Sequence, residues 1–233
     1  MIDEETGAAN TSVGVAVPAA GSGQRMGGVR KAFMELDGRP LLRHALTPFL
    51  DDARVSDIVV AVDEELFDDI PVWLAELAPR VRVVRGGDTR AESVRRALSA
   101  LPDTLAVLAI HDAARPLVTS DVVSRCVDRA LSGVGGVAGS PAVDTIKEVE
   151  DGVIVGSPDR ARLWHAHTPQ VFPAAILRAA YASGVDATDD AALVAAAGGI
   201  VECVDDGGWN LKVTRPSDIA VAEVLLRTRG GAP

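Results

Sequence analysis

Four short runs of apolar residues recur through the first half of the chain. They are VGVAV at residues 13–17, DIVVAV at 57–62, VRVV at 81–84 and LAVLAI at 105–110. A strand that is apolar on both faces must be covered on both sides, which is typical of a parallel sheet between layers of helices. The pattern therefore predicts four buried strands.

Stretches with helical periodicity separate these runs. In TRAESVRRALSAL, residues 89–101, apolar side chains share one face, and Thr89 and Glu92 have the spacing of a capping box. Residues 119–131 repeat the apolar pattern. Strands and helices that alternate in this way form right-handed βαβ units. The predicted fold class is α/β, with a doubly wound, mostly parallel sheet.

The pattern changes after Leu131. Residues 133–158, GVGGVAGSPAVDTIKEVEDGVIVGSP, favour strands and contain the turn sequence EDG, which predicts a protruding β-hairpin. Beyond residue 173 the chain returns to helix, with short strands expected at 200–204 and 211–214 before a last helix. We expect a flexible N-terminal tail at residues 1–12 and a single domain at 13–230, with the β-arm inserted at about 142–164.

Composition and charge limit the classes of function. The 233 residues include 33 Asp and Glu against 23 Lys and Arg, a formal net charge of −10, and only 3% are aromatic. Such a chain repels a phosphate backbone and offers few rings for stacking on bases, so we expect no nucleic-acid partner. Cys126 and Cys203 fit neither a disulfide framework nor a zinc site. We find no signal peptide and no run as long as a membrane span, and therefore expect a cytoplasmic protein with no membrane partner.

The first predicted strand leads directly into the glycine-rich sequence PAAGSGQRMGGVRK, residues 18–31. Glycines at this place let backbone N–H groups approach a phosphate. The segment lacks the Lys-Ser/Thr pair of a Walker A loop, and Met26 replaces the third glycine of a dinucleotide fingerprint. It carries instead two cations, Arg25 and Lys31, that suit the charge of a triphosphate. The alternative is a glycine-rich turn with solvated basic residues.

A second polar cluster, HDAARP at residues 111–116, follows the fourth predicted strand. Ligands of open α/β sheets bind outside the carboxyl ends of the strands, so Asp112 and Arg115 are candidates for chemistry. Asp112 is a candidate ligand of Mg²⁺, which takes oxygen ligands and commonly only one or two carboxylates. The alternative is that Asp112 caps a turn and pairs with Arg115. His111 is equally well explained as a packed core histidine, and we assign it no chemistry.

A series of motifs in fixed order resembles the family of 2-C-methyl-D-erythritol 4-phosphate cytidylyltransferases. The motifs are PAAGSGQRM with Lys31, GGDTRAESV at 86–94, HDAARP, DTIK at 144–147, DRARLWHAHTPQVF at 159–172, TDDA at 188–191 and NLKVTRPSDI at 210–219. The resemblance implies a Rossmann-like nucleotidyltransferase fold. It also implies transfer of CMP from CTP to 2-C-methyl-D-erythritol 4-phosphate, with release of pyrophosphate, in non-mevalonate isoprenoid precursor synthesis.

The resemblance also implies roles for individual residues. The catalytic cations would be Arg25, Lys31 and Lys212, and the metal ligand would be Asp112 with Mg²⁺ as the cofactor. CTP would be bound by Ala19, Ala20, Gly21, Ser22, Gly23, Gly87, Asp88 and Ser93, of which the last three would read the cytosine. The polyol phosphate would be bound by Asp112, Arg115, Thr145, Arg160 and Thr168.

In this family the hairpin arm is exchanged across a homodimer, which implies that Arg160 serves the neighbouring subunit's site. Two positions depart from the family pattern. Arg30 stands where the family commonly has proline, and Trp209 where some members have an acidic residue close to the metal. Asp189 and Asp190 resemble a metal pair, but their position before an apolar helix favours a structural cap.

Three other functions share some of these features. A ribitol 5-phosphate cytidylyltransferase shares the fold but typically opens with an L-A-G-G loop and has Ser-Val in place of Ala113 and Ala114. An NAD-dependent oxidoreductase needs the missing third glycine, although Asp63 and Glu64 supply an acidic residue after the second strand. A catalytically silent nucleotide-binding module has no need for the charged motif residues that this chain retains.

Overall fold

A computed structural model describes residues 10–21, 30–185 and 187–230 of the chain. Its centre is a seven-stranded sheet in the order β11-β7-β10-β6-β1-β4-β5. The strands are β1 (Val13–Pro18), β4 (Val55–Val62), β5 (Val81–Arg85), β6 (Val107–Ile110), β7 (Gly135–Pro141), β10 (Trp164–Pro173) and β11 (Val201–Asp205). Every pairing is parallel except those of β10, which runs antiparallel to both β6 and β7. The predicted α/β class and mostly parallel sheet are confirmed.

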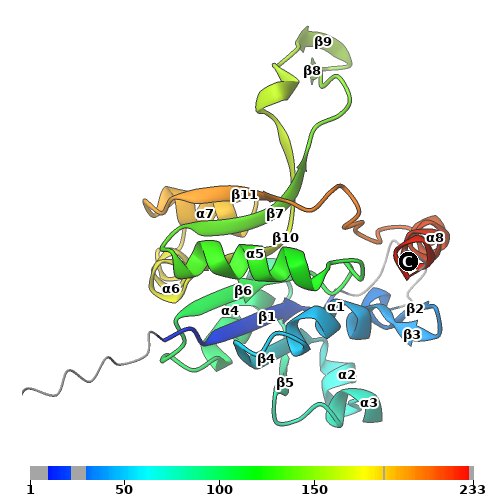
Figure 1. Ribbon diagram of the computed structural model, residues 1–233, viewed down its shortest axis with the longest axis vertical. Coiled ribbons are helices and arrows are strands. Elements are labelled where there is room, and N and C mark those ends of the chain that lie inside the picture. The colour runs from blue at the N-terminus through cyan, green and yellow to red at the C-terminus, as the bar shows by residue number, and fades with distance from the viewer. Residues whose placement is uncertain (1–9, 22–29, 186, 231–233) are drawn as a thin grey trace, which may run out of the picture.

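Helices cover both faces of this sheet (Figure 1). One layer contains α1 (Leu41–Leu50), α2 (Glu64–Asp68), α3 (Val72–Ala75) and α5 (Ser120–Leu131), and the other contains α4 (Arg90–Ala100), α6 (Ala174–Ala182) and α7 (Asp190–Ala196). Side chains of β1 alternate between the layers: Val15 and Val17 pack into the first core, and Ala16 packs into the second. The near-continuous apolar runs of the sequence follow from this burial on both sides.

A third, smaller core lies beyond the end of the sheet. The last helix, α8 (Ser217–Gly230), packs there against the hairpin of β2 (Glu35–Leu36) and β3 (Arg39–Pro40), with Leu36 and Ala222 both fully buried. The short 3₁₀ helix η2 (Lys31–Phe33) leads into this hairpin. Among the described residues, no helix is long and apolar enough to cross a membrane.

The predicted hairpin projects away from the sheet as a narrow arm (Figure 1). Its strands are β8 (Glu148–Glu150) and β9 (Val153–Gly156), followed by the short 3₁₀ helix η3 (Arg160–Arg162). Asp151 and Gly152 at the turn have φ of 48° and 83°, the left-handed pair that a tight two-residue hairpin requires. The EDG turn predicted from the sequence is therefore confirmed.

One predicted strand is wrong. Residues 211–214 form no strand, although the strand expected at 200–204 is present as β11, one residue further on. The backbone N–H of Val213 instead donates to the carbonyl of Ala114 at 2.8 Å, so the segment lies beside the turn that follows β6. Val213 is apolar because its side chain packs into the third core, not because the segment is a strand.

Candidate active site

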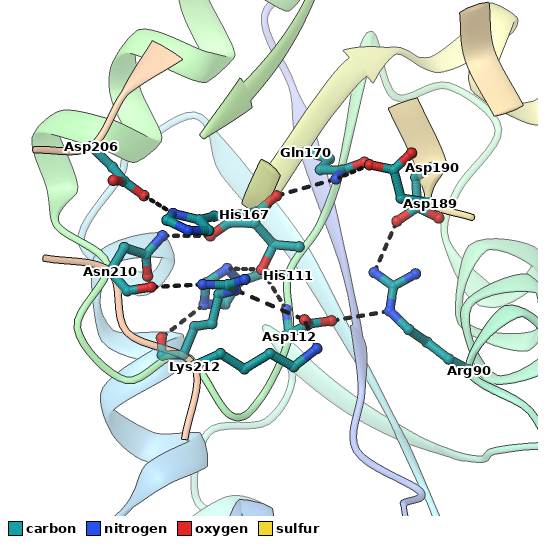
Figure 2. Close-up of polar contacts among 12 residues, drawn as sticks. Arg90, His111, Asp112, His167, Gln170, Asp189, Asp190, Asp206, Asn210 and Lys212 are labelled. Atoms are coloured by element: carbon teal, nitrogen blue, oxygen red, sulfur yellow. Dashed lines mark hydrogen bonds and ion pairs between the residues drawn. The ribbon is translucent and has the colours of Figure 1, made fainter. Parts of the chain in front are cut away.

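Asp112 follows β6 at the carboxyl end of the sheet and lies at the centre of a group of cations (Figure 2). One oxygen of its carboxylate accepts a hydrogen bond from Arg90 Nε at 3.1 Å, and the other accepts from Lys212 Nζ at 2.7 Å. Arg115 Nε lies 3.9 Å from the second oxygen. Burial acts to raise the pKa of Asp112, but the charges of Arg90 and Lys212 outweigh it and hold the pKa well below its ordinary value. Asp112 is therefore an anion that gathers three cations.

Arg90 connects Asp112 to a second buried carboxylate. Arg90 Nη2 donates to Asp190 Oδ2 at 2.9 Å, and the other oxygen of Asp190 accepts from the hydroxyl of Tyr181. Burial acts to lower the pKa of Arg90, but the charges of Asp190 and Asp112 outweigh burial and raise the pKa above its ordinary value. The guanidinium therefore stays charged. The contacts run from Tyr181 on α6 to Lys212 and join five separate parts of the fold. Arg90 lies in the motif GGDTRAESV, but the sequence alone assigns it no role.

The buried His111 contacts Thr168 and the carbonyl of Arg115 and so helps to fix the backbone around Asp112. Thr168 Oγ1 accepts from the N–H of Asp112 at 2.9 Å and lies 3.2 Å from His111 Nδ1, while His111 Nε2 lies 3.2 Å from the carbonyl of Arg115. Because a carbonyl only accepts, we assign the ring proton to Nε2, and Nδ1 then accepts from the Thr168 hydroxyl. Burial lowers the pKa of His111 to about 4. His111 also packs against Phe49, with ring centroids 5.2 Å apart, as expected of a core histidine.

The irregular segment 206–213 brings Lys212 to Asp112. Asn210 Nδ2 donates to the carbonyl of Thr168 at 2.8 Å, and the carbonyl of Asn210 accepts from Arg115 Nη1 at 2.7 Å. Arg115 is thus buried beneath the segment rather than open to solvent. Two polar atoms here, Arg115 Nε and Asn210 Oδ1, are buried without a hydrogen-bond partner among the described residues.

Two loops at the ends of β1 and β5 lie against each other. A Cβ placed on Gly86 would lie 2.4 Å from the Cβ of Ala20, so only glycine permits this approach. Ser93 Oγ accepts from the N–H of Gly87 at 3.0 Å and donates to the carbonyl of Thr89 at 3.0 Å. Ser93, predicted to read the cytosine, is buried. Its hydroxyl holds the backbone of the Gly87 loop in place.

The start of α4 at Thr89 confirms one of the two hydrogen bonds of the predicted capping box. Thr89 Oγ1 accepts from the N–H of Glu92 at 3.0 Å, as predicted. The Glu92 carboxylate accepts from the N–H of Asp88 at 3.1 Å, one residue before the position that a capping box uses. This contact fixes the backbone of Asp88, another of the predicted CTP-binding residues.

Other predicted site residues lie apart from this centre or outside the described residues. Ser22, Gly23 and Arg25 belong to the part of the glycine-rich segment outside the described residues, as do most of residues 1–12. Lys31 begins η2 and is partly buried. Thr145 and Arg160 are exposed on the arm, where Arg160 Nη1 donates to the carbonyl of Val143 at 2.7 Å.

Acidic residues elsewhere near the site serve as helix caps. Asp189 caps α7 by accepting from the N–H of Ala192 at 2.9 Å, as predicted. Asp63 caps α2 and also pairs with Arg30 Nε at 3.1 Å, so the acid that an NAD site would use is already engaged. Among the described residues, no three His, Cys, Asp or Glu side chains are grouped to hold a metal ion.

Comparison with known proteins decides the family. The family described as 2-C-methyl-D-erythritol 4-phosphate cytidylyltransferase matches residues 13–228. The chain belongs to this family. It is 43% identical over 221 residues to the family member of Nocardia farcinica, covering 94% of this chain and 95% of that protein. It is 40% identical over 226 residues to the member of Symbiobacterium thermophilum, with the same coverages of 94% and 95%.

Solved structures of the family have the same fold. The 4-diphosphocytidyl-2C-methyl-D-erythritol synthase of Anaerococcus prevotii superposes with a TM-score of 0.82 at 25% identity, covering 93% of this chain and 96% of that chain. The 2-C-methyl-D-erythritol 4-phosphate cytidylyltransferase of Thermus thermophilus superposes with a TM-score of 0.76 at 32% identity, covering 93% of this chain and 98% of that chain. The resemblance inferred from the ordered motifs is confirmed.

Proposed function

We propose that this protein transfers CMP from CTP to 2-C-methyl-D-erythritol 4-phosphate and releases pyrophosphate. Membership of the family supports the reaction, and the cluster of Asp112, Lys212 and Arg90 at the carboxyl end of the sheet supports the place where it occurs. That end is where open α/β sheets bind their ligands. The product serves non-mevalonate isoprenoid precursor synthesis. Since both substrates are charged, soluble phosphates, we also propose that the enzyme is cytoplasmic.

The transfer is an in-line displacement at the α-phosphorus of CTP. A phosphate oxygen of the polyol phosphate forms the new P–O bond, the bond to the bridging oxygen breaks, and its electron pair leaves with pyrophosphate. A phosphate monoester already carries between one and two negative charges near pH 7, because its second pKa is about 6. The nucleophile therefore needs no general base, and the protein's task is to position the two substrates and to neutralise charge.

Lys212 is the described cation best placed for the reacting phosphates. The anionic Asp112 holds its ammonium group at 2.7 Å, and the Lys212 side chain is 41% exposed on its other side. The carboxylate thus orients Lys212 while leaving it open toward solvent and an incoming phosphate. Lys31 and Arg25 would neutralise the β- and γ-phosphates from the glycine-rich segment, with Ala19, Ala20 and Gly21 beneath the nucleotide.

Asp112 also fits the single carboxylate that a Mg²⁺ ion needs when phosphate oxygens supply other ligands. It is held anionic, and the hydrogen bond to one of its oxygens comes from the partly exposed Lys212. Bound there, Mg²⁺ would neutralise charge on the triphosphate. The two cation contacts already present keep Asp112 ionised, whether or not the ion is bound.

We further propose that the arm joins two subunits. Val143, Val153 and Ile154 on the arm are 78%, 65% and 61% exposed, which is unfavourable for apolar side chains unless a partner covers them. In a dimer the arm would carry Thr145 and Arg160 to the polyol phosphate of the neighbouring subunit, whose other contacts would be Asp112, Arg115 and Thr168.

The reaction is tested by pyrophosphate release with CTP, Mg²⁺ and a panel of polyol phosphates. We expect release with 2-C-methyl-D-erythritol 4-phosphate and far less with ribitol 5-phosphate. Preference for ribitol 5-phosphate would replace the proposed substrate, and no release with any polyol phosphate would overturn the proposed function. Omission of Mg²⁺ with excess chelator should abolish release.

Subunit exchange is tested by mixing two inactive variants. Arg160→Ala should impair use of the polyol phosphate while CTP binding stays nearly unchanged, and Lys31→Ala should impair turnover. If the arm is exchanged, mixed dimers contain one site with neither substitution, and some activity returns. Absence of rescue in dimers shown to be mixed would contradict the exchange.

A further inference from the structure

His167 and Asp206 form a polar pair next to the candidate active site. His167 Nδ1 lies 2.6 Å from Asp206 Oδ2 (Figure 2). The other Asp206 oxygen accepts from the N–H of Gly208 at 3.0 Å. The Asp206 side chain is fully buried and that of His167 is 16% exposed. Burial acts to raise the pKa of Asp206, but the hydrogen bond and charge of His167 outweigh it and lower the pKa. A carboxylate buried at this depth requires such partners.

The pair lies where the chain leaves the sheet. The N–H of Asp206 donates to the carbonyl of Gly139 at 2.8 Å, continuing the ladder between β11 and β7. Gly207 and Gly208 then have φ of 70° and 73°, which turns the chain toward the end of β6. Because glycine adopts many backbone conformations, these two residues do not by themselves fix the direction of the segment that follows. Contacts at the start of the segment must do so.

The same segment continues to the site through contacts already described. Asn210 bonds to Thr168, the residue after His167, and Lys212 then bonds to Asp112. Two neighbouring residues of β10, His167 and Thr168, therefore each hydrogen-bond to the segment. Thr168 also accepts from the backbone N–H of Asp112. Trp209 lies between these points, with the guanidinium of Arg229 5.7 Å from its ring centroid.

We propose that the His167–Asp206 pair is a positioning device that sets the place of Lys212 for the transfer. The pair touches none of the reacting groups and acts through the segment 206–212. The proposal rests on the proposed function for its kinetic consequence, but the placement of the segment is a separate property of the fold. A shift of about 1 Å in a positioned group can cost on the order of 10²-fold in rate.

Two amide substitutions at position 167 separate the hydrogen bond from the rest of the side chain. In His167→Asn the amide nitrogen falls near the place of Nδ1 and can still donate to Asp206. In His167→Gln it falls near the place of Nε2 and misses that carboxylate. We expect His167→Gln and His167→Ala to lower kcat on the order of 10-fold to 100-fold with little change in the KM for CTP. His167→Asn should stay within about threefold of the wild type, since it keeps the bond.

A double-mutant cycle shows whether the pair acts through Lys212. In a Lys212→Ala background we expect His167→Gln to change kcat by less than about twofold, because the group that it positions is gone. Equal effects in both backgrounds would overturn the proposal, as would equal kcat values for His167→Asn and His167→Gln. His165→Ala is the matched control, since His165 is an exposed histidine on the same strand and has no assigned role.

The indole N–H signal of Trp209 gives a readout that does not depend on the reaction. In NMR spectra we expect this signal to shift or broaden in His167→Gln and to stay in place in His167→Asn. Unchanged signals in both variants would overturn the proposal. If the wild-type protein releases no pyrophosphate while the Trp209 signal responds as expected, the proposed function fails and the structural part of the proposal survives.

Discussion

Acidification should destabilise the fold through His111, the buried histidine beside Asp112. Burial lowers the pKa of His111 to about 4, against about 6.5 in an unfolded chain. Between these values the unfolded state binds a proton that the folded state does not, so stability falls as pH falls. Linkage with these two pKa values gives a loss of about 2 kcal/mol in the free energy of unfolding between pH 7 and pH 5. Below about pH 4 both states bind the proton, so His111 no longer makes the free energy of unfolding depend on pH.

Urea unfolding at pH 7, 6 and 5 measures the effect, with His111→Gln as the comparison. Glutamine can keep the hydrogen bond to the carbonyl of Arg115 but does not titrate, so its stability should fall less with acid than that of the wild type. His165→Gln removes an exposed histidine and should leave the wild-type slope unchanged. If the wild type and His111→Gln lost the same stability over this range, the assigned burial cost of His111 would be refuted.

Three further substitutions test other parts of the site. Lys31→Ala should lower kcat on the order of 10²–10³ in pyrophosphate release while thermal unfolding still shows a folded protein, and near wild-type turnover would exclude its role. Tyr181→Phe removes the hydroxyl that donates to Asp190 and should cost about 1–3 kcal/mol in urea unfolding; no measurable change would show that the bond contributes nothing. Gly86→Ala would place a Cβ 2.4 Å from that of Ala20, so CTP affinity by calorimetry should fall about tenfold, and unchanged affinity would separate this contact from nucleotide binding.

The buried strands could be predicted because burial on both faces leaves a local trace, a short continuous apolar run. β1, β4, β5 and β6 all carried that signal, and the hairpin carried its turn sequence. β10 carried no such signal, because its first half supports the exposed base of the arm and only its second half crosses the core. The sequence pattern alone therefore did not show the antiparallel strand inside the sheet.

The site could be predicted only where its residues fall within local motifs. Asp112 and Lys212 were found through HDAARP and NLKVTRPSDI, but the contact between them depends on how distant segments meet. Arg90 and Asp190 are 100 positions apart and are joined only because α4 and α7 meet at one end of the sheet. The pair of His167 and Asp206 was missed for the same reason.

We expect CTP to bind at the carboxyl end of the sheet, between the loops after β1 and β5, with its α-phosphate near Lys212. A crystal structure with CTP and Mg²⁺, grown without polyol phosphate, measures this directly. We expect cytosine against Gly87 and Ser93, and phosphates within reach of Lys31 and Lys212. Nucleotide bound elsewhere, with these loops and Lys212 free of it, would contradict the claim.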